Sequence, residues 1–165
     1  METQISDTQI EQNVERVILE NLYKSLDQRL GHPAGDMEIC DEMEITLDEF
    51  QQILDRFKGL SLGSFQKESS RNGRGREEPM IRYIPDASQK DTFYIFHKSE
   101  IQKTLAGAIE ALPKMERLIA SLSYFDELTP KEIAAVLGIN ESRVSHLRTK
   151  ATLRLRSKLS ESGAV

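Results

Sequence analysis

The stretch from Thr129 to Leu159, TPKEIAAVLGINESRVSHLRTKATLRLRSKL, decides how the C-terminal part of this chain folds. Thr129 and Glu132 flank Pro130 at the spacing of a capping box, which predicts a helix that begins at Pro130. Gly138 follows the apolar residues of that helix. Because glycine adopts positive φ without steric cost, Gly138 can end the helix in a tight turn.

A second helix is expected directly after this turn. Asn140 is a favourable cap residue, and the apolar residues beyond it recur at intervals of three and four (Val144, Leu147, Ala151 and Leu155). Two short helices joined by a glycine-containing turn form a helix-turn-helix. We expect Val144 to pack against the first helix of the pair.

The opposite face of the second helix is polar and basic. Residues 140–158 carry six Lys or Arg and one Glu, a net charge of +5 in a chain of −5. A basic surface confined to one helix of an acidic protein is typical of a phosphate partner. The alternative is an ordinary helix pair without a ligand. The candidate DNA-binding residues are Lys131, Ser142, Arg143, Ser145, His146, Thr149, Lys150 and Arg154.

This part of the chain resembles the C-terminal promoter-binding domain of bacterial sigma factors. The residues that carry the resemblance are LPKMER at 112–117, LT at 128–129, EIA at 132–134, VLGI at 136–139, SRVS at 142–145, KA at 150–151 and RLR at 154–156. Within the family, the sequence is most similar to the alternative flagellar and sporulation type. The resemblance implies recognition of the upstream (−35) element in double-stranded promoter DNA and contact with the β flap of the RNA polymerase core.

The N-terminal part predicts a small unit of three helices, residues 9–60. A helical repeat of apolar residues ends at Leu30, and Thr46-Leu-Asp-Glu49 is another capping box. The unit resembles the central domain of the same sigma type, although Cys40 and Glu44 stand where a small residue and a turn glycine are expected. Residues 1–65 hold 14 acids and 5 bases, which disfavours close approach to phosphates, so DNA contact by this unit stays open.

Between the two parts, residues 61–98 are rich in Ser, Gly and Pro and predict a flexible linker. It contains a basic cluster, SRNGRGR at 70–76, and a short β-like run at 80–84. Residues 99–160 are then expected to form a four-helix domain that begins with a cap at Ser99. Tyr124 and Phe125 are predicted in its core, with an exposed aromatic pair as the alternative. The fold class is therefore all-α: two small helical domains joined by a linker, the second a helix-turn-helix domain.

The sequence also argues against several functions. Cys40 is the single cysteine and the three histidines are scattered, so no disulfide or metal site is expected. We find no phosphate loop or catalytic motif and expect a non-enzyme without cofactors. No apolar run approaches membrane-spanning length, and a cytoplasmic location is expected.

Three functions follow from these features. The first is a sigma factor, or a portion of one, that lacks the domain that melts promoter DNA. The resemblance then leaves room for two partners, an anti-sigma factor and a separate protein that supplies the melting domain. The second is a stand-alone helix-turn-helix transcriptional regulator. The third is an interaction protein whose acidic N-terminal half covers its own basic helix or binds a polymerase surface.

Overall fold

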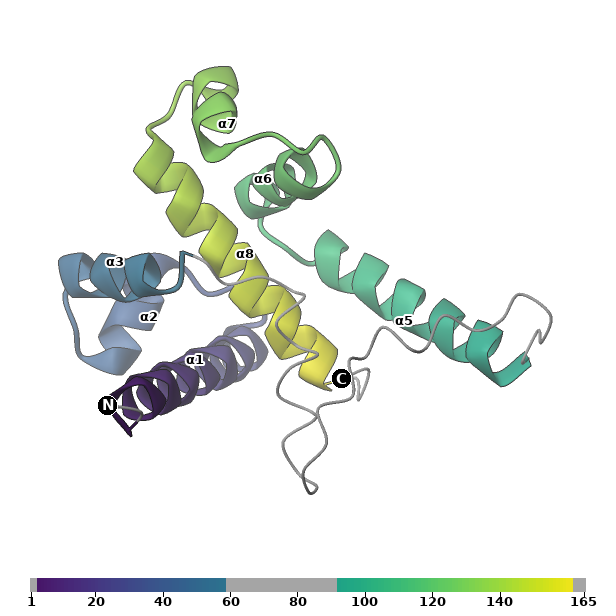
Figure 1. Cartoon of the computed structure of the whole chain (residues 1–165), viewed down its shortest axis with the longest axis horizontal. Coiled ribbons are helices and arrows are strands. Elements are labelled where there is room, and N and C mark those ends of the chain that lie inside the picture. Colours follow the sequence, from purple (N-terminus) through teal and green to yellow (C-terminus); the bar gives the residue numbers. More distant parts are fainter. Residues whose placement is uncertain (1–2, 59–91, 162–165) are drawn as a thin grey trace.

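The computed structural model describes residues 3–58 and 92–161, and in these ranges the regular structure is all helical. Its helices are α1 (Thr3–Leu30), α2 (Asp36–Met43), α3 (Leu47–Arg56), α5 (Thr92–Glu110), α6 (Lys114–Tyr124), α7 (Pro130–Leu137) and α8 (Glu141–Glu161). Figure 1 shows α8 running through the middle, with α1–α3 on one side and α5–α7 on the other. Helix α8 contacts α1, α3, α5, α6 and α7, so it packs against both parts of the chain.

The turn between α7 and α8 has the predicted helix-turn-helix geometry. Thr129 caps α7 by accepting from the Glu132 amide, while its own amide donates to Glu132 Oε2 at 2.8 Å. Gly138 lies at φ 65° and ψ 31°, the left-handed conformation expected of the turn glycine. The Arg143 amide donates to Asn140 Oδ1 at 2.7 Å, which confirms Asn140 as the cap of α8.

A small apolar core holds this motif against α6. Val144 is fully buried beside Ile119 and Ile133, and Leu147 completes the cluster. Since these residues come from α6, α7 and α8, they fix the direction in which the first turn of α8 leaves the core. Val144 therefore packs as predicted.

A second turn of similar geometry joins α2 to α3. Glu44 ends α2 at φ 54° and ψ 39°, at the position where the sequence comparison expects glycine. Thr46 then caps α3 through the predicted capping box, its amide donating to Glu49 Oε2 at 2.7 Å. A side chain in the left-handed region is strained, which a glycine would avoid.

The core of α1–α3 includes one residue from the far end of the chain. Leu153 of α8 is fully buried in the same cluster as Leu19, Tyr23, Leu26 and Phe50. The N-terminal core is thus closed by α8. The division of the chain into two domains stays a prediction, but the two parts share this helix.

Two expectations for residues 92–125 are wrong. Helix α5 begins at Thr92, so Ser99 lies inside a helix. Tyr124 and Phe125 are not core residues, because they are 49% and 85% exposed. Along α1, four apolar side chains are exposed (Ile10, Val14, Val17 and Ile18). The SRNGRGR cluster and the β-like run at 80–84 lie outside the described residues.

Candidate nucleic-acid interface

The predicted DNA-binding residues fall into two groups along α7 and α8. Lys131, Ser142 and Arg143 are exposed at the helix-turn-helix end, and Ser145 is half-buried. The other four are buried at 4–7% exposure (His146, Thr149, Lys150 and Arg154). The sequence pattern placed all of these on a solvent-facing surface, and for the second group that placement is wrong.

The buried basic side chains of α8 lie beside acidic residues of the N-terminal helices. His146 Nε2 lies 2.8 Å from Asp55 Oδ1 at the end of α3. Lys150 Nζ lies 2.6 Å from Asp36 Oδ1 at the start of α2. Arg143 remains exposed, with its guanidinium 3.6 Å from the other Asp36 oxygen.

Arg154 is the most heavily contacted of these basic side chains. Its NH1 lies 3.1 Å from Asp27 Oδ1 on α1, its NH2 donates to the carbonyl of Ala34, and its Nε lies 3.0 Å from Glu116 Oε2 on α6. The guanidinium also lies over the Tyr23 ring, 4.4 Å from the centroid, in cation–π geometry. Arg154 thus connects α1 and α6 through α8.

Burial affects the protonation of the groups around Arg154. Burial raises the pKa of Tyr23 well above its usual value, so the phenol stays neutral. Burial also raises the pKa of Glu116, although the nearby Arg154 charge opposes that shift. By contrast, Asp55 is half-exposed, and hydrogen bonds from Lys58 and then His146 lower its pKa.

Further contacts continue along the same face toward the C-terminus. Arg156 Nε lies 2.8 Å from Glu20 Oε1, and Ser157 Oγ donates to the Glu20 carbonyl at 2.9 Å. Sequence reasoning missed Arg156, Ser157 and Leu153 as contact residues. One signal in the sequence was Leu153 itself, a leucine seven residues after His146 on a face otherwise rich in charge.

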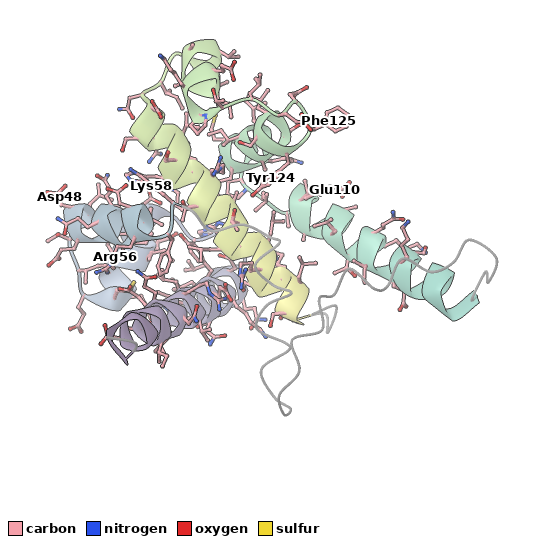
Figure 2. The ribbon with its side chains drawn as sticks, viewed as in Figure 1. Asp48, Arg56, Lys58, Glu110, Tyr124 and Phe125 are labelled. Carbon is pink, nitrogen blue, oxygen red and sulfur yellow. The ribbon has the colours of Figure 1, made fainter. Side chains whose placement is uncertain are left out.

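A separate apolar surface lies on α6 and just beyond it. Met115 and Leu118 are about two-fifths exposed, Tyr124 is half-exposed, and Phe125 follows. Figure 2 shows the Phe125 ring projecting from the end of α6, away from the body of the protein. Exposed aromatic residues of this kind are typical of a protein-binding surface.

Within residues 3–58 and 92–161, no group of three or more His, Cys, Asp or Glu could hold a metal ion. In the same ranges, none of the helices combines the length and apolarity needed to cross a membrane.

The chain matches proteins of known family over most of its length. Residues 108–157 match the family model for Sigma-70, region 4. RNA polymerase sigma factor FliA of Yersinia enterocolitica is 36% identical over 136 residues, which are 82% of this chain and 57% of that protein. RNA polymerase sigma factor SigF of Mycobacterium tuberculosis is 32% identical over 134 residues, 81% of this chain and 49% of that protein.

The solved structure of the flagellar sigma/anti-sigma complex Sigma-28/FlgM aligns with 91% of this chain and 62% of its own, at 27% identity and a TM-score of 0.49. The chain spans about half the length of the curated relatives it matches. Residues 108–157 therefore form a Sigma-70 region 4 domain, and the chain belongs to the sigma factor family, within which it is similar to the FliA type.

Proposed function

We propose that this chain recognises the upstream (−35) element of promoter DNA and directs RNA polymerase to it during transcription initiation. One observation carries the proposal. The capped turn at Gly138 and Asn140 presents Ser142 and Arg143 to solvent on the first turn of α8, while Val144 fixes that turn to the core. The first turns of the second helix are the part of a helix-turn-helix that meets base edges in the major groove.

Within this function, the exposed residues have separate roles. Arg143 contacts a base edge, for which a guanidinium is suited by its paired donors. Lys131 and the N-terminus of α7 lie beside the backbone, where a positive charge and free amides favour phosphate. His146, Thr149, Lys150 and Arg154 extend the same face and contact DNA once the N-terminal helices move away from it.

The polymerase-binding surface is the apolar one on α6. Tyr124 and Phe125 supply exposed aromatic area beside the DNA-binding helix, which suits the β flap of the core enzyme as partner. The chain then acts by binding rather than by catalysis, in the cytoplasm where polymerase works. An anti-sigma factor would compete for the same apolar surface, and promoter melting would come from a separate domain or partner.

The test compares base readout with general charge. Arg143→Ala should weaken binding to a duplex carrying a flagellar-type −35 element by about 1–3 kcal/mol and reduce its preference over a scrambled duplex. Lys103→Ala is the matched control, because it removes one exposed positive charge from α5. Fluorescence anisotropy with both duplexes measures the preference. Equal losses on the two duplexes would contradict sequence recognition by Arg143.

A further inference from the structure

The basic face of α8 is already occupied by the chain's own acidic helices. We infer that α1–α3 form a removable cover, held by Asp27, Asp36 and Asp55, that competes with DNA for this face. The inference rests on the proposed function, since it assumes that the same face binds DNA. It adds that the chain regulates its own access to promoters.

The first support is the geometry of the pairs. His146, Lys150 and Arg154 are four residues apart, so they form one row along α8 with a rise of about 6 Å between neighbours. Each pairs with a carboxylate from a different helix, namely α3, α2 and α1 in turn. The three acids thus present a line of negative charge to a helix suited to a line of phosphates. A carboxylate paired with one of these side chains takes the place that a phosphate of DNA occupies in the proposed complex.

The second support is that the interface is built rather than incidental. The side chains of His146, Lys150 and Arg154 are at least 92% buried, and Leu153 fills the N-terminal core between Lys150 and Arg154. The Ala34 carbonyl and the Glu20 carbonyl accept from Arg154 and Ser157, which fixes the register of the two surfaces. Loose electrostatic contacts between exposed side chains would bury neither the charges nor a leucine.

The third support is energetic. A buried charge is unfavourable unless it is paired, so removing the Asp36 carboxylate leaves Lys150 without its acidic partner in the interface. The covered state is therefore sensitive to single substitutions. Apparent DNA affinity is then the intrinsic affinity reduced by the fraction of molecules that are uncovered.

The covered state leaves a point of entry. Ser142 and Arg143 stay exposed at the edge of the cover, and Arg143 lies 3.6 Å from the same Asp36 that holds Lys150. A phosphate that approaches Arg143 competes with the Asp36 carboxylate for this guanidinium. Asp36 is thus the acidic residue that DNA meets first.

The experiment removes negative charge from the cover in the full chain. Asp36→Asn should tighten binding to both the −35 duplex and the scrambled duplex by about tenfold or more, since an unpaired buried Lys150 favours the uncovered state. The double variant Asp27→Asn/Asp36→Asn should tighten it further. Asp48→Asn is the control. Asp48 is exposed at the start of α3, so this substitution removes the same charge at a site away from α8 (Figure 2). Its effect should stay within about twofold, as for an exposed charge.

A measurement without DNA separates the cover from the proposed function. Small-angle X-ray scattering should show a larger radius of gyration for the double variant than for the control. If size and affinity both match the Asp48→Asn control, there is no removable cover. If the molecule expands without binding DNA more tightly, the cover does not compete with DNA. If affinity rises equally while no variant prefers the −35 duplex, the cover stands and −35 recognition fails.

Discussion

Leu153→Ala tests whether the apolar part of the α8 interface controls access to DNA. Leu153 is fully buried in the core of α1–α3, and the substitution removes none of the charges of α8. Any change in DNA binding must then come from the position of the N-terminal helices. This separates the cover from the DNA contacts, which a substitution of Lys150 or Arg154 cannot do.

The size of the effect follows from the burial of the side chain. Truncating a fully buried leucine costs about 2–5 kcal/mol, because the transfer energy is lost and a cavity remains. A shift of that size changes the ratio of uncovered to covered molecules by roughly 30-fold to several thousand-fold. The gain in apparent affinity is limited by the wild-type covered fraction, since it ends when every molecule is uncovered.

Leu155→Ala is the matched control, two residues further along the same helix. Leu155 is also buried, but it packs with Ala108, Leu112, Ala120 and Ala151 on the side of α5 and α6. Both variants should lower the melting temperature. Fluorescence anisotropy should show tighter DNA binding for Leu153→Ala and no tightening for Leu155→Ala. If both variants lose affinity alike, α1–α3 support the DNA-binding helix rather than cover it.

Further predictions concern the two turns, a buried acid and the exposed aromatic surface. Gly138→Ala should lower the free energy of unfolding by about 1–2 kcal/mol. The added Cβ meets no atom within 4 Å, so the cost comes from holding alanine in the left-handed conformation. Glu44→Gly should have the opposite sign, and denaturant melts of the full chain check both. Burial holds the pKa of Glu116 above its usual range, so the native state binds a proton that the unfolded state has lost. Stability should therefore fall as pH rises from about 4.3 through the raised pKa, and Glu116→Gln should flatten that fall in melts across pH 4–7. Phe125→Ser should weaken binding to core polymerase in a pull-down with little change in melting temperature, whereas a large drop in melting temperature would mean that the ring packs in the core.

The local features of the fold were predictable because they depend on neighbouring residues. The caps at Thr46, Thr129 and Asn140 need a side chain and an amide three residues apart, and the structure contains each one. Gly138 lies in the left-handed region for the same local reason. Glu44 does so as well, although its side chain gave no sign of it. The resemblance to the sigma central domain, rather than the Glu44 side chain, indicated a glycine position there.

The burial of α8 was not predictable from its own periodicity. The face that carries His146, Lys150 and Arg154 is as polar as a solvated face, and its partners lie 91–127 residues away in the sequence. Periodicity identifies an apolar face toward a core but gives no signal for a polar face that meets complementary charge. The uneven distribution of acids and bases was the available hint, and it supported the third of the functions considered from the sequence.

Salt provides a final prediction, because it acts on the cover and on DNA binding in opposite directions. Binding to DNA releases counterions, so log K falls with log salt by about 0.9 for each phosphate contacted. Opening the cover exposes Asp27, Asp36 and their cationic partners to solvent, where they regain counterions, and salt therefore favours opening. The wild-type chain combines the two effects and should show a shallower slope than Leu153→Ala, which starts uncovered. Lys150→Ala removes a phosphate contact, which weakens DNA binding, and also weakens the cover, which strengthens it. Its apparent DNA affinity should therefore change little, while the slope of log K against log salt changes clearly. Parallel salt lines for the wild type and Leu153→Ala would mean that the ion pairs of α8 play no part in controlling access to DNA.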